Sequence, residues 1–183
     1  MTTDRQLLNA SEMQKAISRM ADELHRAAGA DDRPVLIGIR THGVTLAKRI
    51  QAIFREKYAA EPPLGILDIT LYRDDLNLPG SVQPVVRPTQ IDFDLNDRTV
   101  LLIDDVLYTG RTIRCALDEI MDFGRPASVK LGVLIDRGRR ELPIQPDVTG
   151  ITVETTPEES IRVRFREADR EEGAWVHTRA PEA

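Results

Sequence analysis

The 183-residue sequence has little cysteine, few aromatics and no long apolar run. Its one cysteine, Cys115, excludes an intrachain disulfide and fits a reducing compartment. Aromatic residues make up 4%, too few for an extended platform that stacks single-stranded bases. No segment approaches the ~20 apolar residues that span a bilayer. The first residues lack a basic region followed by an apolar run, so we expect no signal peptide, no membrane partner and a cytoplasmic protein.

The charge balance is acidic. The formal net charge is -5 and the pI is near 5.3. This balance argues against indiscriminate nucleic-acid binding, although it allows a local basic patch. The length suits one domain with a core of its own, without a metal or disulfide to hold it together.

Strand-like and helix-like patterns alternate along most of the chain. A capping box of Ser11 and Gln14 predicts the start of a first helix, which Gly29 ends. We expect strands at 34–39, 64–72, 99–103 and 128–135, and helices over 44–54 and 113–121. Strands that alternate with helices predict a parallel α/β sheet covered on both faces. Residues 73–98 are rich in Pro, Asp and Asn, which predicts a long loop.

Beyond residue 140 we expect two short strands, 147–155 and 160–165, which form a small subdomain with the N-terminal helix. Arg162, Arg164 and Arg166 alternate with apolar residues and should share one strand face. A solvated face is the favoured interpretation of this stripe. The charged segment from residue 167 is expected to fray at its end.

The segment VLLIDDVLYTGRT, residues 100–112, carries the clearest chemistry. An apolar strand runs into Asp104 and Asp105, and a turn with Thr109 and Gly110 then opens a helix. Ligands of open parallel sheets bind beyond the carboxyl ends of the strands, and backbone N–H groups at a helix N-terminus favour phosphate. Carboxylates beside such a cradle suit sugar hydroxyls and Mg²⁺. An acidic pair alone is more often a turn and helix cap, but the whole segment suggests a ribose phosphate.

This segment resembles the phosphoribosyl pyrophosphate (PRPP) motif of type I phosphoribosyltransferases. Four further segments are similar to the family of bifunctional pyr operon regulators with uracil phosphoribosyltransferase activity: AISRMADEL, IGIRTHGVTLAKRI, LDITLYRDDL and GRPASVKLGVLIDRGRRELPIQPDVTG. The resemblance covers nearly all of residues 11–165. LYRDDL and DRGRRELPI distinguish this family from purine phosphoribosyltransferases.

The resemblance implies the type I phosphoribosyltransferase fold, a central, mostly parallel sheet flanked by helices, with a small hood and a long flexible loop. The expected organisation is one domain, residues 1–183, with a core over about 31–140. The hood is expected from the N-terminal helix and about 141–178. The implied reaction converts uracil and PRPP to UMP and pyrophosphate in pyrimidine salvage, with Mg²⁺ as cofactor, and the family forms dimers or larger homo-oligomers.

The resemblance also assigns roles to residues. Asp104, Asp105 and Arg73 are implied as catalytic residues. Asp104 and Asp105 hold the ribose hydroxyls, directly or through Mg²⁺ and water, and Arg73 begins the loop that can close over PRPP. Asp136 and Arg137 lie in the uracil region. The pyrophosphate loop comprises Arg40, Thr41, His42 and Gly43, and the 5′-phosphate loop comprises Val106, Leu107, Tyr108, Thr109, Gly110, Arg111 and Thr112. His42 departs from the arginine that relatives often carry, and there is no signal for a dedicated general base.

Regulators of this family bind a leader mRNA hairpin, promoted by uridine nucleotides such as UMP and UTP. The RNA contacts implied here are Ser18, Arg19, Arg139 and Arg140, with Thr41. Gln145 replaces a common arginine, Asp22 replaces a common histidine, and Arg139 replaces a usual histidine. Because salt-dependent RNA affinity needs several clustered cations, this reduced set leaves RNA binding open.

Two alternatives remain at this point. One is an RNA-binding attenuator with little or no catalytic activity, although the acidic pair and both phosphate loops favour the enzyme. The other is a purine or orotate phosphoribosyltransferase, which DRGRRELPI opposes. Turnover with uracil, hypoxanthine and orotate discriminates among them.

Overall fold

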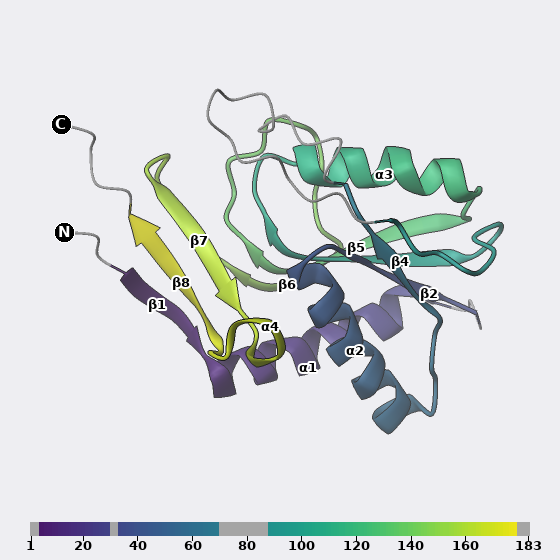
Figure 1. Cartoon of the computed structure of the whole chain (residues 1–183), viewed down its shortest axis with the longest axis horizontal. Helices are drawn as coiled ribbons and strands as arrows, with labels where there is room; N and C mark the ends of the chain where they lie inside the picture. The colour runs from purple at the N-terminus through teal and green to yellow at the C-terminus, as the bar shows by residue number, and fades with distance from the viewer. Residues whose placement is uncertain (1–3, 30–32, 70–87, 179–183) are drawn as a thin grey trace.

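The computed structural model describes residues 4–29, 33–69 and 88–178. They form two sheets (Figure 1). The larger sheet has the order β3-β2-β4-β5-β6 and is parallel throughout, as expected. Its strands are β2 (Val35–Ile39), β3 (Leu64–Leu67), β4 (Thr99–Leu107), β5 (Ser128–Asp136) and β6 (Val148–Thr152). The smaller sheet, β1-β8-β7, is antiparallel and is called the hood below.

Helices cover both faces of the larger sheet. Helices α1 (Ala10–Ala27) and α2 (His42–Tyr58) pack on one face, and α3 (Arg111–Phe123) packs on the other (Figure 1). Side chains of β4 alternate between the two layers, since Leu101 and Ile103 face α1 and α2 while Val100 and Leu102 face α3. All four are fully buried, which explains why this strand is an uninterrupted apolar run.

The first helix begins two residues earlier than predicted, because its N-cap is Asn9 rather than Ser11. Asn9 is the N-cap and its side chain accepts a bond from Glu12 N–H, while Glu12 Oε2 accepts from Asn9 N–H. The box is therefore Asn9 and Glu12, not Ser11 and Gln14, because strand β1 (Asp4–Asn9) runs directly into the helix. A cap of this kind contributes about 1 kcal/mol.

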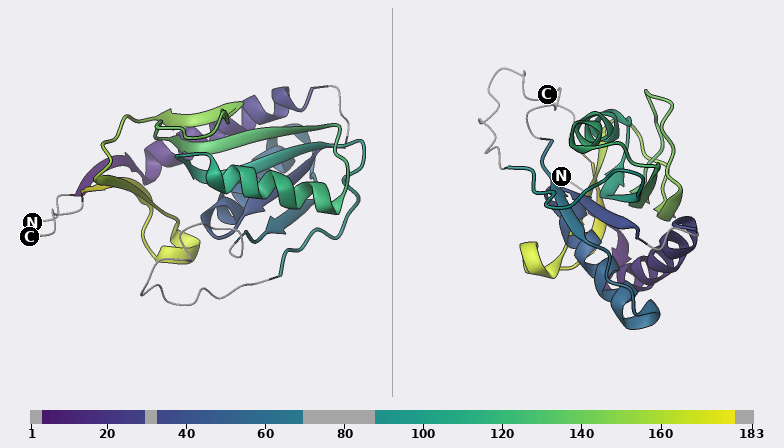
Figure 2. Two further views of the ribbon diagram at one scale, coloured as in Figure 1. Left: turned by 90° about the horizontal axis from the view of Figure 1, so that it is seen from above. Right: turned by 90° about the vertical axis from the view of Figure 1, so that its right-hand side faces the viewer.

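The hood differs from its prediction. It consists of β1, β7 (Glu159–Arg164) and β8 (Gly173–Thr178), with the short helix α4 (Arg166–Asp169) between the last two. The predicted strand 147–155 is instead β6, an edge strand of the larger sheet, and α1 packs on that sheet. The charged C-terminal segment forms β8 and pairs with β1, so the two ends of the described chain lie side by side (Figure 2).

The predicted long loop lies largely outside the described residues. Within the described part, Gln90 makes an isolated antiparallel bridge to Ile66 of β3. Among the residues described, no helix combines the length and apolarity needed to cross a membrane.

Candidate active site

Polar residues gather at one edge of the larger sheet, where its parallel strands end. Arg40 follows β2, Asp68 follows β3, and Asp136 ends β5. Asp104 and Asp105 lie near the end of β4, the central strand. The sheet therefore brings the predicted pyrophosphate loop, acidic pair, phosphate loop and uracil region to one edge.

The acidic pair lies within strand β4. The strand continues through both acids because Leu107 still pairs with Asp136 of β5. Asp104 is 6% exposed and its Oδ1 accepts a bond of 3.0 Å from Asp105 N–H. Asp105 is half-buried, with its side chain 22% exposed. The pair thus offers one rigidly held and one accessible carboxylate.

The predicted phosphate loop turns tightly into α3. Gly110 is the N-cap with φ 92°, a conformation that L side chains rarely adopt. Thr109 Oγ1 accepts from Arg111 N–H at 3.3 Å. The carbonyl of Thr109 accepts from the backbone N–H groups of Glu141 and Leu142. The loop that contains Glu141 and Leu142 therefore supports the predicted phosphate loop through these hydrogen bonds.

The predicted pyrophosphate loop opens helix α2, which begins at His42. The Arg40–Thr41 peptide bond is cis. Gly43 lies directly against β4, since a Cβ at this position would be 2.6 Å from the carbonyl oxygen of Ile103. The same Cβ would be 3.3 Å from Asp104 Oδ1. Glycine here is a requirement of close approach between the helix N-terminus and the acidic pair.

Arg40 has a partner that the sequence did not single out. Its Nε lies 3.6 Å from Oδ2 of Asp68, a carboxylate whose side chain is 1% exposed. Arg40 Nη2 also donates to Pro88 O at 3.4 Å. The buried Nε has no hydrogen-bond partner among the residues that the structure describes. Asp68 therefore lies against the cationic side chain of Arg40, the first residue of the predicted pyrophosphate loop.

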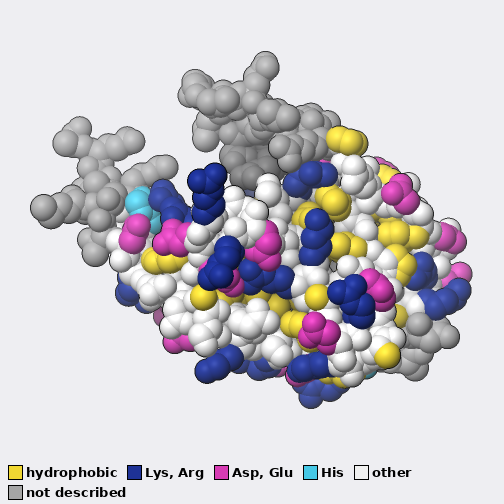
Figure 3. Space-filling view, turned by 60° about the horizontal axis from the view of Figure 1, so that its bottom comes forward, with side chains coloured by type: hydrophobic (Ala, Val, Ile, Leu, Met, Phe, Trp, Pro, Cys, Tyr) yellow, Lys and Arg dark blue, Asp and Glu magenta, His cyan; other side chains and the backbone are white. Residues whose placement is uncertain are grey.

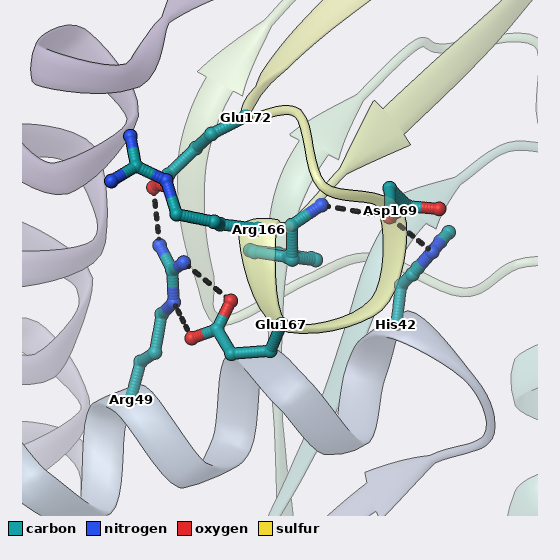
Figure 4. A network of polar contacts seen from close by, with 7 residues as sticks. His42, Arg49, Arg166, Glu167, Asp169 and Glu172 are labelled. Carbon is teal, nitrogen blue, oxygen red and sulfur yellow. Dashed lines mark hydrogen bonds and ion pairs between the residues drawn. The ribbon is translucent and has the colours of Figure 1, made fainter.

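His42 lies between two carboxylates from different parts of the chain. Nδ1 is 3.5 Å from Asp105 Oδ2. Nε2 is 3.2 Å from Asp169 Oδ2 of α4 (Figure 4). Hydrogen bonding to Asp105, opposed by burial and assisted by Asp169, raises the pKa of His42 above its ordinary value. The loop residue is therefore joined both to the acidic pair and to the hood.

A second set of contacts attaches the hood to α2. Arg49, two turns after His42, forms a bidentate pair with Glu167 and a 2.6 Å bond to Glu172 (Figure 4). Its guanidinium also lies 5.0 Å from the centroid of the buried Phe165 ring. Burial lowers the pKa of the Arg49 guanidinium, but the hydrogen bonds and charges of Glu167 and Glu172 outweigh this effect. The pKa of Arg49 is therefore raised above its ordinary value. Planar, bidentate pairing gives this attachment a fixed geometry.

The predicted uracil residues are both held by internal contacts. Asp136 accepts from Gly138 N–H and from Arg140 Nη2. Arg137 is buried and stacks on the ring of Tyr108, 3.9 Å from its centroid. It also donates to Thr155 Oγ1 and to the carbonyl of Glu159. Arg137 thus connects the phosphate loop to the segment that leads into the hood.

The predicted RNA residues are spread over α1 and the loop after β5. Ser18 accepts a bond from Lys57, whose ammonium also pairs with Asp22 at 2.9 Å. Arg19 donates to the carbonyl of Gly150 yet keeps a side chain that is 55% exposed. The guanidinium groups of the other two candidates also have internal partners: Arg139 binds Thr155 O, and Arg140 binds Asp136, Tyr108 O, Gly138 O and Ile144 O.

Basic and acidic side chains are interspersed on the face drawn in Figure 3. The predicted arginine stripe is only partly correct, because Arg166 belongs to α4 rather than to the strand. Arg164 pairs with Glu171 and lies over the ring of Trp175. These contacts fit a solvated face with local charge pairing.

Arg73 lies outside the described residues. Sequence reasoning missed Asp68, Arg49 and Asp169. The position of Asp68 directly after a strand is a signal that could have found it. No local pattern marks Arg49 or Asp169 as site residues, because the contacts that they make between α2 and α4 span more than 115 positions of the chain.

Comparisons with known proteins agree with this geometry. Residues 4–167 match the family model of the phosphoribosyl transferase domain. A bifunctional protein PyrR of Roseiflexus sp. is 53% identical over 91% of this chain and 90% of its own length. A PyrR protein of Thermus thermophilus is 48% identical over 91% of this chain and 92% of its own.

Solved structures show the same fold at low sequence identity. A hypoxanthine-guanine phosphoribosyltransferase of Bacillus anthracis superposes with a TM-score of 0.71 at 14% identity, covering 97% of this chain and 100% of its own. A hypoxanthine phosphoribosyltransferase of Staphylococcus aureus gives 0.67 at 18% identity, covering 97% and 93%. At this identity the likeness concerns the fold alone. The type I phosphoribosyltransferase fold, the paired loops at one sheet edge and the close PyrR relatives agree: this chain belongs to the PyrR family of phosphoribosyltransferases.

Proposed function

We propose that the protein transfers the 5-phosphoribosyl group of PRPP to uracil. One observation carries the proposal: the acidic pair, the phosphate loop and the pyrophosphate loop occupy one edge of one sheet. The bond between ribose C1 and the pyrophosphate oxygen breaks, and pyrophosphate leaves with the electron pair. A bond from C1 to uracil N1 forms, and the N1 proton is released to solvent. The products are UMP and pyrophosphate.

Each group of residues contacts a different part of PRPP. Asp104 and Asp105 accept hydrogen bonds from the ribose hydroxyls. The N-terminus of α3 and the Thr109 hydroxyl donate to the 5′-phosphate, while the N-terminus of α2 and Arg40 face the pyrophosphate. Donors that are already held in place stabilise the charge that develops on the leaving group without reorganisation. The protein therefore acts mainly by positioning and electrostatics.

Asp104 and Asp105 also fit a divalent cation. Mg²⁺ is commonly held by one or two carboxylates together with substrate oxygens. Among the described ranges no group of three or more His, Cys, Asp or Glu is arranged to hold a metal, so PRPP would supply the remaining ligands. When bound, Mg²⁺ neutralises part of the charge on the pyrophosphate.

We assign the binding site of the uracil base to the end of β5. Asp136 and Arg137 border this region, and Arg137 fixes the Tyr108 ring there. The purine specificity in the names of the solved structures does not transfer to this chain at 14–19% identity. The close relatives named PyrR support uracil.

The test is UMP formation from uracil and PRPP with Mg²⁺, with hypoxanthine and orotate as competing bases. Asp104→Asn combined with Asp105→Asn is expected to lower kcat by two orders of magnitude or more, roughly the effect of losing preorganised electrostatic contacts. Retained thermal stability shows that the variant is folded. Turnover of hypoxanthine or orotate but not uracil would overturn the base assignment.

We propose regulation of a pyr operon by RNA binding as the second activity. The support is the word "bifunctional" in the names of relatives and the exposed Arg19 side chain. The test is binding of a leader hairpin with and without UMP at two salt concentrations. Arg19→Ala should weaken binding and lower its salt dependence. Unchanged binding in this variant would remove α1 from the RNA surface.

A further inference from the structure

The hood contributes one carboxylate to the edge that carries the acidic pair. Asp169 belongs to α4, between the two last strands of the smaller sheet, and its side chain is 28% exposed. Its Oδ2 lies 3.2 Å from Nε2 of His42 and accepts a 2.9 Å bond from Phe165 N–H. The carboxylate is therefore fixed to the backbone of the hood as well as to the loop histidine.

The other ring nitrogen of His42 continues the chain of contacts. Nδ1 lies 3.5 Å from Asp105 Oδ2, so each nitrogen of the ring lies near a carboxylate. The ring also lies against Phe165, 5.8 Å between centroids. Because Phe165 is fully buried, it limits how the imidazole can tilt.

Nothing else in the described residues restrains Asp105 in the same way. Its neighbour Asp104 is buried and accepts from a backbone N–H group, whereas Asp105 is the more accessible of the two. A carboxylate that holds a ribose hydroxyl must keep its direction, since a misplacement of about 1 Å can cost on the order of 100-fold in rate.

We propose that His42 and Asp169 are positioning residues for Asp105, so that the hood sets the orientation of the accessible acid of the PRPP site. This inference rests on the proposed function. The order of contacts is Phe165 N–H, Asp169, His42 and Asp105. The main role of His42 is then to orient Asp105, the carboxylate that holds a ribose hydroxyl, and its contribution to pyrophosphate binding is secondary.

Two residues of α4 provide a matched pair of variants. Asp169→Ala removes the contact to His42, whereas Glu167→Ala removes an acid two positions away that binds Arg49 instead. Both variants remove a contact between the hood and α2. Only the first interrupts the contacts that lead to Asp105. Asp169→Asn keeps an acceptor oxygen for Phe165 N–H and for the ring, and serves as the conservative variant.

We expect Asp169→Ala to lower kcat/KM for PRPP by about tenfold, on the scale of small misplacements of a reacting group. The KM for uracil should stay unchanged. Asp169→Asn should restore most of the activity, and Glu167→Ala should stay within about twofold of wild type. In a His42→Gln background, Asp169→Ala should cause little further loss, because coupled residues are not additive.

A second readout does not depend on turnover. The protein has three histidines, so the ring protons of His42 can be assigned by NMR with His42→Gln. They should shift in Asp169→Ala and in Asp105→Asn, but not in Glu167→Ala. If wild type transfers to no base, the proposed function fails while this NMR result still tests the contacts.

Two results would overturn the inference. One is an equal loss of kcat/KM in Asp169→Ala and Glu167→Ala, which would mean that the hood matters only as a whole. The other is an undiminished effect of Asp169→Ala when His42 is already glutamine, since the effect would then not pass through the ring.

Discussion

Replacing Gly43 with alanine tests how closely the pyrophosphate loop must approach the acidic pair. The new Cβ would lie 2.6 Å from Ile103 O and 3.1 Å from Asp104 Cα, both of them backbone atoms of the central strand. Real Cβ atoms essentially never come within 3.0 Å of a heavy atom of a residue that is not their chain neighbour. The start of α2 must therefore move away from β4 by at least about 0.4 Å, and further for an ordinary contact.

That displacement acts directly on the site. Overpacking costs about 1–3 kcal/mol of the free energy of unfolding. A shift of half an ångström to one ångström in a group that positions substrate is expected to lower kcat/KM for PRPP by roughly 10- to 100-fold. Activity should fall much more than stability alone explains, because the displaced residues carry the pyrophosphate loop.

The assay compares steady-state kinetics and urea unfolding of Gly43→Ala with those of Gly132→Ala. Gly132 lies in the middle of β5, where the atoms nearest to a Cβ are side-chain atoms of Leu24 and Ile103, at 3.1 to 3.2 Å. The control should lose stability but keep kcat/KM. Full activity in Gly43→Ala, with PRPP affinity unchanged, would refute the view that this close approach sets the geometry of the site.

Two further predictions concern the hood and the loop after β5. A hydrogen bond from Arg49 lowers the pKa of Glu167, so the stabilising effect of this carboxylate is present above the ordinary value of 4.5 and is lost as pH falls through the lowered pKa. Glu167→Gln should therefore lower Tm at neutral pH, and the difference from wild type should vanish well below pH 4.5; a constant difference would contradict the ion pair as its cause. Arg137→Lys keeps the charge but loses the guanidinium hydrogen bonds to Thr155 Oγ1 and Glu159 O and the stacking on Tyr108, and should cost about 2–4 kcal/mol in urea unfolding. A loss under about 0.5 kcal/mol would mean that these contacts contribute little.

The larger sheet was predictable because its signals are local. Apolar runs such as residues 99–103 are buried on both faces, and the helix period after each one marks the covering helices. The carboxyl-edge rule then brought Arg40, Asp104 and Asp136 together from sequence alone. The roles of these residues came from the family resemblance, because their spacing alone does not indicate them.

The hood was not predictable in the same way. Strands β1 and β8 have polar, partly exposed residues, and they pair across nearly the whole length of the chain. Their stability comes from that distant pairing and from the packing of Leu8, Ala174 and Val176. Asp169 and Arg49 were missed for this reason, since both make their contacts between the hood and α2. Pairing over long sequence distances leaves little trace in local periodicity.

The pairing of β1 with β8 has a consequence for synthesis on the ribosome. Asp4 and His177 face each other although 173 positions separate them. Strand β1 therefore has no partner until residues 173–178 have been made. The parallel sheet, with its phosphate loop and acidic pair, can fold before that, because domains form as the chain emerges. A nascent chain would thus display the acidic pair before α4 covers His42, and the segment proposed to restrain Asp105 through His42 would reach its place after the parallel sheet.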